Sequence, residues 1–141
     1  MTTRRIAPIL LGVAAIPVTL GLSGCSAFEP LLGGGSTSAV YRSTDAFADA
    51  AEKAGTSVPD WVTADATTIR VVYRDHGAIL MTTPASDLAG CTDNGTTVEA
   101  PFIDSWWPLE PPATAKDCPG DWVVFTEGSS SYGYTTGSVR H

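Results

Sequence analysis

The side chains of this 141-residue chain that could carry out chemistry are few, namely three cysteines, two histidines and 15 carboxylates. A thiolate is the strongest nucleophile that a side chain offers near neutral pH, so each cysteine needs an assignment. His76 falls in an expected turn and His141 at the end of the chain. An imidazole at either place is solvated and unoriented, so we expect neither to act as a catalytic base. Histidine and cysteine together also supply too few ligands for a zinc site.

Pairs of carboxylates could act as acid and base on a glycosidic bond or hold calcium. Two such pairs stand close in the sequence, Asp104 with Glu110 and Asp93 with Glu99. Among 15 acidic residues, however, pairs of this kind also arise by chance. The segment 93–99 lacks the alternating oxygen ligands of an EF-hand loop. We therefore expect no enzyme, no metal and no cofactor, and keep a small carboxylate-based hydrolase of the cell envelope as the alternative.

Aromatic residues give a second kind of candidate site. Adjacent Trp106 and Trp107 precede a proline and could form a rigid platform, with Tyr132 and Tyr134 further along the chain. Tryptophan and tyrosine are favoured at recognition surfaces because they combine a large apolar area with a polar group. We predict these four residues as a binding surface for an envelope glycan or a protein partner. The competing interpretation is that Trp61 and Trp122 fill the core and that one of the adjacent pair covers the sheet.

The first 24 residues have the layout of a cleaved signal peptide. Arg4 and Arg5 form a cationic start, residues 6–22 are mostly apolar, and small residues follow. A transmembrane helix would need about 20 apolar residues, whereas this run is interrupted by Pro8 and Pro17. The segment therefore predicts export. The route, Sec or twin-arginine, stays open.

The residues at the end of this leader, Leu22-Ser23-Gly24-Cys25, resemble the lipobox of bacterial lipoproteins. The resemblance implies a diacylglycerol on the Cys25 sulfur, cleavage after Gly24, and an acylated N-terminus held at the outer face of the cell membrane. Two or more acyl chains anchor a protein stably. The competing interpretation is a signal-peptide end followed by an incidental free cysteine.

Three parts of the chain are expected: a signal peptide over 1–24, a lipidated N-terminus with a flexible Gly/Ser tether over 25–40, and a single small extracytoplasmic domain over 41–137. After residue 24 the chain carries six basic and 15 acidic residues, a net charge of -9. This charge argues against nucleic acid as a partner and against electrostatic adsorption to anionic lipid. The layout also resembles short lipoproteins of unknown function in high-GC Gram-positive bacteria.

Helical and strand patterns account for part of the expected domain. Ser43 or Thr44 can cap a helix through Ala54, whose apolar side chains form one stripe. Residues 69–74 and 78–83 alternate or run apolar, which predicts a hairpin with a three-residue connection that ends in glycine.

A second hairpin is predicted from 122–126 with 132–136. The stretch between the two hairpins is dense in proline and glycine, so we expect it to be ordered but irregular. Cys91 and Cys118 bracket most of it, and in an exported protein two such cysteines are expected to pair. Two free thiols are the alternative.

Taken together, the patterns predict an α+β fold: a small antiparallel sheet of about four strands with one helix packed on it and a long disulfide-braced loop. The predicted function is that of a lipid-anchored extracytoplasmic surface protein, a non-catalytic binding or interaction module of the cell envelope. A two-lobed solute-binding lipoprotein would need about twice this length.

Overall fold

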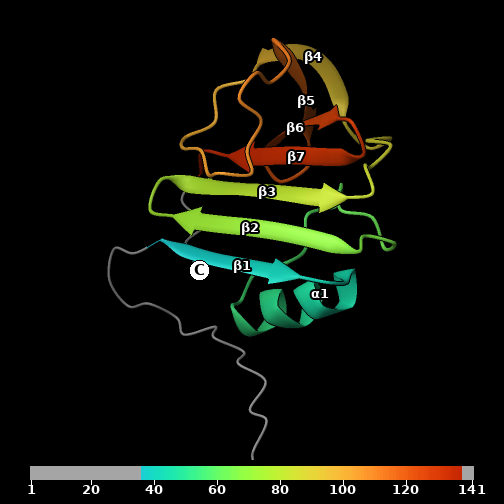
Figure 1. Cartoon of the computed structure of the whole chain (residues 1–141), viewed down its shortest axis with the longest axis vertical. Coiled ribbons are helices and arrows are strands. Elements are labelled where there is room, and N and C mark those ends of the chain that lie inside the picture. Colours follow the sequence, from blue (N-terminus) through green and yellow to red (C-terminus); the bar gives the residue numbers. More distant parts are fainter. Residues whose placement is uncertain (1–35, 138–141) are drawn as a thin grey trace, which may run out of the picture.

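The computed structural model describes residues 36–137, which form seven strands and one helix. All seven strands belong to one antiparallel sheet with the spatial order β1-β2-β3-β7-β6-β5-β4 (Figure 1). Two meanders, β1 to β3 and β4 to β7, are therefore joined where β3 pairs with β7. The elements are β1 (Thr37–Tyr41), α1 (Thr44–Lys53), β2 (Thr68–Arg74), β3 (Gly77–Thr83), β4 (Thr92–Thr97), β5 (Thr114–Cys118), β6 (Trp122–Glu127) and β7 (Ser130–Thr135).

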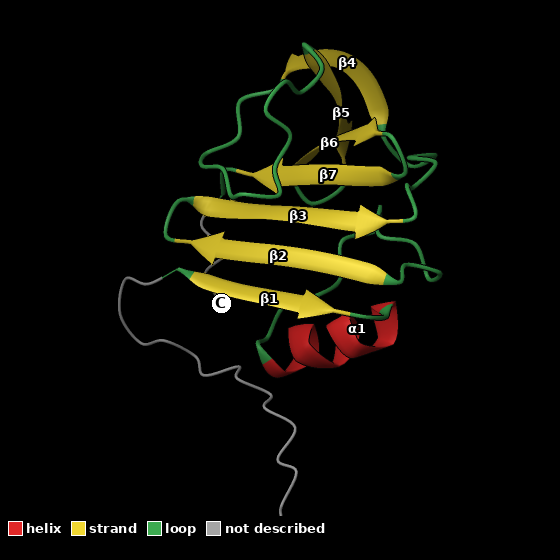
Figure 2. Cartoon of the chain, viewed as in Figure 1, coloured by secondary structure: helices red, strands yellow, loops and turns green. Residues whose placement is uncertain are grey.

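The predicted α+β class with about four strands is wrong, because the described chain is mostly β with a single short helix (Figure 2). Strand β1 begins at Thr37, inside the segment expected to be a tether. Strands β4 and β5 lie in the stretch expected to be irregular. The sequence of β4 is polar and exposed and contains Asn94-Gly95, a pair that favours turns. Such a strand lacks the apolar alternation from which strands are predicted.

Helix α1 confirms the helix prediction at both ends. The Ser43 side chain caps it by accepting a hydrogen bond from the Ala46 N–H at 3.2 Å. Its last turn closes in a Schellman motif, in which the Thr56 N–H donates to the Ala51 carbonyl at 2.9 Å and Gly55 takes a φ of 72°. The helix lies beside β1 and buries Phe47 and Ala51.

Both predicted hairpins form, with shorter turns than the sequence suggests. Arg74 pairs with Gly77 and Glu127 pairs with Ser130, so each turn contains two residues. Gly77 has a φ of 142°, and a Cβ there would collide with the backbone carbonyl of Thr135 on the neighbouring strand. This close approach explains why glycine stands at the start of β3.

The sheet buries apolar side chains on both of its faces. We call the side that contacts α1 the helix face and the opposite side the loop face. The helix face holds one cluster of buried residues, namely Phe47, Trp61, Val62, Ala66, Ile69, Val71, Leu80, Leu88, Cys118 and Val124. The loop face holds a second cluster, namely Val72, Ile79, Trp107, Ala115, Phe125 and Tyr134.

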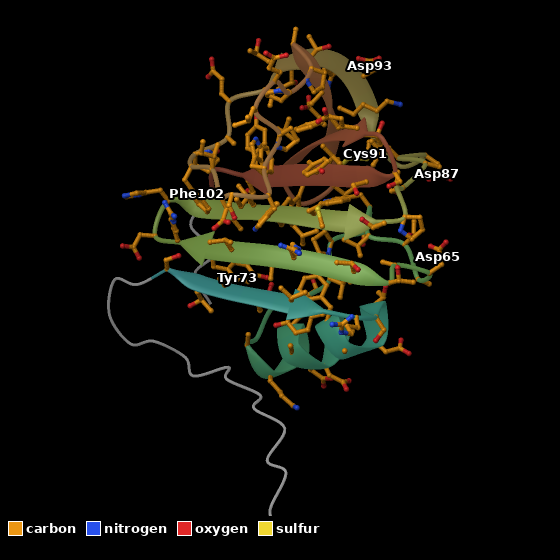
Figure 3. The ribbon with its side chains drawn as sticks, viewed as in Figure 1. Asp65, Tyr73, Asp87, Cys91, Asp93 and Phe102 are labelled. Carbon is orange, nitrogen blue, oxygen red and sulfur yellow. A yellow bond between two sulfur atoms is a disulfide. The ribbon has the colours of Figure 1, made fainter. Side chains whose placement is uncertain are left out.

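The long connection from β4 to β5 covers the loop face. Val98, Ala100 and Phe102 from this connection pack against the second cluster. The Phe102 ring lies at the turn end of the β2–β3 hairpin, with the Arg74 guanidinium 4.4 Å from its centre (Figure 3). A cation over an aromatic ring is attracted by the ring quadrupole, which helps to hold this connection on the sheet.

The predicted disulfide between Cys91 and Cys118 is confirmed. It joins the residue just before β4 to the last residue of β5, so it braces two strands rather than a single irregular loop. In the chain-entropy account, a cross-link over 27 residues constrains the unfolded chain by about 3 to 4 kcal/mol. The disulfide also holds Cys118, the last residue of β5, in place at the start of the β5–β6 turn.

Candidate functional site

The predicted aromatic surface turns out to be an aromatic cluster of the core. Trp107 is only 5% exposed, and its ring centre lies 5.6 Å from that of Phe125, 5.8 Å from Tyr132 and 6.4 Å from Tyr134. The Trp107 contacts with the three rings are edge-to-face, an arrangement that aromatic quadrupoles favour. Trp107 therefore covers the sheet, as in the competing interpretation.

Tyr134 is also buried and has a structural partner for its hydroxyl. The hydroxyl donates to the Thr97 carbonyl at 3.1 Å and accepts from the Glu99 N–H at 2.9 Å. Trp107 and Tyr134, which were predicted to lie on a binding surface, are therefore buried in the core instead. Trp106 and Tyr132 are half-buried at the edge of the same cluster.

The remaining predicted residues are not gathered into a site. Cys25 and His141 lie outside the described residues, and His76 is exposed in the β2–β3 turn. Three of the four paired carboxylates are exposed, whereas Asp104 accepts a hydrogen bond from the Ser105 N–H at 2.6 Å.

Among residues 36–137, no group of three or more histidine, cysteine or acidic side chains could hold a metal ion. No helix there is long and apolar enough to cross a membrane.

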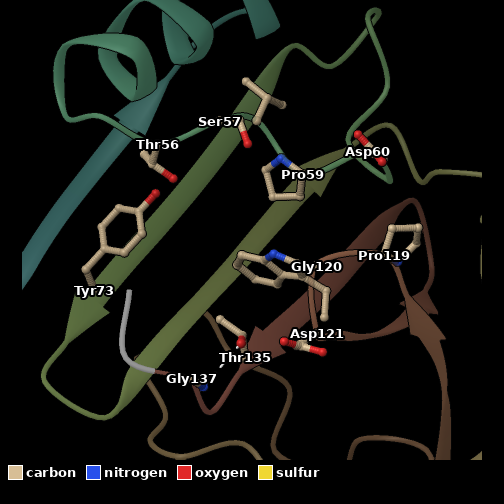
Figure 4. Close-up of a pocket in the computed structure, with 12 residues that line it drawn as sticks. Thr56, Ser57, Pro59, Asp60, Tyr73, Pro119, Gly120, Asp121, Thr135 and Gly137 are labelled. Carbon is tan, nitrogen blue, oxygen red and sulfur yellow. Dashed lines mark hydrogen bonds between the residues drawn. The ribbon is translucent and has the colours of Figure 1, made fainter. Parts of the chain in front are cut away.

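A cleft of about 310 Å³ opens on the helix face, at the end of the sheet where β1 begins (Figure 4). Four segments that are distant in sequence form it: the connection after α1, the end of β2, the β5–β6 turn and the end of β7. The lining residues are Thr56, Ser57, Val58, Pro59, Asp60, Tyr73, Pro119, Gly120, Asp121, Trp122, Thr135 and Gly137. Because polar and apolar groups both line the cleft, we take it as the candidate binding site.

Trp122 supplies the large apolar surface of the cleft and packs on another tryptophan, Trp61. Its ring packs edge-on against Trp61, with the two ring centres 5.7 Å apart. Trp61 is buried in turn against Gly133 of β7, where a Cβ would overlap the indole ring. The half-buried Trp122 ring therefore rests on a rigid support, which is what a recognition surface requires.

Tyr73 contributes a hydroxyl that stays protonated. Burial raises its pKa to about 12, and the nearby Tyr41 adds to this rise. Tyr73 is therefore neutral at every physiological pH, so its hydroxyl can both donate and accept hydrogen bonds. Thr135, at 6% exposure, adds a second hydroxyl, whose oxygen accepts from the Gly137 N–H at 3.3 Å.

Asp60 and Asp121 are the charged residues among those that line the cleft, and both are exposed at its rim. Asp121 takes a φ of 60° in the tight turn after Cys118, a left-handed conformation that aspartate adopts more readily than most residues. No lysine, arginine, histidine or free thiol belongs to the described lining, so the charged groups that line the cleft are carboxylates. A carboxylate accepts hydrogen bonds and can also act as a base.

The cleft could not be predicted from the sequence. Trp122 lies in a predicted strand, and Pro119-Gly120-Asp121 is typical only of a turn, so neither pattern indicates a binding site. Comparison of the chain with protein-family models, with curated proteins and with solved structures gives no match.

Proposed function

We propose that the chain is a lipid-anchored extracytoplasmic surface protein whose folded part is a non-catalytic binding module of the cell envelope, acting through the cleft. The observation that carries the binding role is the cleft itself, in which a supported Trp122, neutral hydroxyls and two carboxylates surround a volume of about 310 Å³. Ligand sites in proteins are concave and combine apolar surface with a few polar groups in this way.

The Cys91–Cys118 disulfide supports the extracytoplasmic part of the proposal. Disulfides persist in oxidising compartments and are rare in the cytosol. The lipobox resemblance of Leu22-Ser23-Gly24-Cys25 supports a lipid on Cys25 and the outer face of the cell membrane as the location.

The topology supports a cleft that lies close to the membrane. The chain enters the sheet at Thr37, which pairs with Tyr73 of the cleft. Residues 25–35, which are expected from the sequence to be a tether, separate the proposed anchor from the described domain. A Gly-rich chain of that length would span on the order of 20 Å. A ligand that is part of the envelope next to the membrane is therefore within reach of the cleft.

A carboxylate-based envelope hydrolase is the second candidate, because Asp60 and Asp121 line the same cleft. Such an enzyme uses one carboxyl as an acid and the other as a base or nucleophile. We favour binding over hydrolysis because both carboxylates are exposed, whereas the acid of such a pair is held in apolar surroundings.

Labelling and fractionation test the anchor. Cells that express the chain are fed a palmitate analogue, and the purified protein is analysed by mass spectrometry. We expect lipid on Cys25 and protein in the membrane fraction, whereas Cys25→Ala is unlabelled and released. Cys25→Ala protein that stays in the membrane fraction would contradict the proposed anchor.

A further inference from the structure

We propose that the cleft binds a saccharide, either neutral or carrying amino groups, with Trp122 against the sugar ring and Asp60 and Asp121 accepting its hydrogen bonds. This inference rests on the proposed function, because it takes the cleft as the binding site. It specifies that the ligand is a saccharide and that the saccharide is not anionic.

Trp122 gives the cleft a broad aromatic surface against which a sugar ring can pack. Trp122 is half-buried and packs edge-on against Trp61, which in turn packs against the backbone of Gly133. A fixed planar ring matches the apolar face of a pyranose, which presents several C–H groups in one plane. A flexible aliphatic lining would instead favour a lipid tail, whereas the aliphatic side chains of the described lining are Val58 and the rigid rings of Pro59 and Pro119.

The lining of the cleft supplies both donors and acceptors of hydrogen bonds. Neighbouring hydroxyls on a sugar donate and accept at once, so a sugar site needs both functions. Asp60 and Asp121 are acceptors, whereas the hydroxyls of Tyr73 and Thr135 can donate. The Thr135 oxygen already accepts from the Gly137 N–H at 3.3 Å, which leaves its proton for a ligand.

The charge of the cleft disfavours anionic ligands. The two charged residues of the described lining are both acidic, and the chain after residue 24 carries a net charge of -9. An anionic ligand such as a uronic acid or a phosphate would face repulsion without a cation to pair with it. Neutral sugars are accepted, and amino sugars gain a charge-assisted hydrogen bond to a carboxylate.

The size of the cleft agrees with a short saccharide. Its volume of about 310 Å³ lies at the lower end of the range of roughly 300–1,000 Å³ found for ligand pockets. The cleft is open to solvent at the rim where Asp60 and Asp121 lie, so a chain of sugars can continue beyond it.

The test is a tryptophan-fluorescence titration of the full mature chain in detergent with three trisaccharides of different charge. Triacetylchitotriose is neutral, chitotriose carries amines and trigalacturonic acid is anionic. We expect saturable changes with the first two, tighter binding of the amine form, and none with the acid. Trp122→Phe should abolish the change and Trp106→Phe, the matched control outside the cleft, should retain it.

Substitutions of the two exposed carboxylates provide a second test, which applies even if Trp122→Phe does not fold. Asp60→Asn and Asp121→Asn should each weaken binding about tenfold, because each loses a charged acceptor while asparagine tolerates the same backbone. Equal binding of the anionic trisaccharide, no saturable change with any of the three, or a response that depends on Trp106 instead of Trp122 would overturn the inference.

A parallel measurement separates failure of this inference from failure of the proposed function. The same preparation is assayed for lipid on Cys25 and for binding to isolated cell envelopes. Envelope binding that Trp122→Phe abolishes, without any binding of the trisaccharides, overturns the saccharide class alone. An unlabelled Cys25 and no envelope binding overturn the proposed function as well.

Discussion

The indole ring of Trp61 lies directly against the backbone of Gly133, so closely that a Cβ on Gly133 would overlap the ring. This contact joins the connection after α1 to the central strand β7 and sets the height of Trp61 above the sheet. Trp122 packs edge-on against Trp61, so the same contact positions the aromatic side of the cleft.

Gly133→Ala should therefore destabilise the domain. Overpacking of this kind costs about 1 to 3 kcal/mol, because the displaced ring is buried on all sides. Chemical unfolding of the purified chain measures the loss. Gly90→Ala is the matched control, since nothing lies within 4 Å of a Cβ at that position. Equal stability of the two variants would contradict the packing described for Trp61.

Tyr134→Phe should loosen the start of the connection that covers the loop face. The substitution removes the hydroxyl that bonds the Thr97 carbonyl and the Glu99 N–H. A lost pair of partly buried hydrogen bonds costs about 1 to 2 kcal/mol. Hydrogen exchange should show a faster Glu99 amide in Tyr134→Phe than in Tyr132→Phe, the control on the same strand. An unchanged exchange rate of the Glu99 amide would show that the hydrogen bonds of the Tyr134 hydroxyl do not hold this connection in place.

Asp117 should make the pairing of β4 with β5 sensitive to acid. Side-chain hydrogen bonds from Asn94, at 2.8 Å, and from Thr96, at 2.7 Å, lower the pKa of this carboxyl from 3.8. Because the folded-state pKa is the lower one, the stabilisation is fully present above the unfolded pKa and is lost as the pH falls through the folded value.

Asp117→Asn should therefore flatten the decline in stability at pH values below about 4. Unfolding curves measured from pH 6 to pH 2 provide the comparison. Asp93→Asn, at an exposed position on β4, is the control and should keep the decline of the parent chain. A decline that is the same in all three proteins would refute the role of Asp117.

Reduction of the disulfide should weaken the domain and disturb the β5–β6 turn. A protein with Cys91→Ser and Cys118→Ser should lose about 3 to 4 kcal/mol of unfolding free energy if the chain-entropy account holds. Mass spectrometry of the non-reduced parent should find neither cysteine open to alkylation. Two alkylated thiols in the native protein would contradict the bridge.

The parts of the fold that the sequence predicts are those with strong local patterns. Ser43 and Gly55 mark the ends of α1, and the apolar alternation of 69–74 marks a strand that is buried on both faces. The unpredicted strands β4 and β5 are polar or short, and their pairing is secured by the sheet and the disulfide rather than by local preference.

The aromatic residues show why the site could not be predicted. Trp107 is followed directly by Pro108, and Trp122 follows the turn sequence Pro119-Gly120-Asp121, but neither pattern indicates whether the ring is buried or exposed. Their roles differ because the connection from β4 to β5 folds over the loop face and buries Trp107, whereas Trp122 borders a cleft that four distant segments form. That difference depends on the β3–β7 pairing, which no short stretch of sequence encodes.

The most direct test of the central claim maps where the chain binds soluble fragments of the cell envelope, by chemical-shift changes in the NMR spectrum of the full mature protein. We predict that the shifted amides lie in 56–60, at Tyr73 and in 119–122, with little change around Trp106. Shifts centred on Trp106 and its neighbours, or no shifts at saturating amounts of the fragments, would contradict a binding module that acts through the cleft.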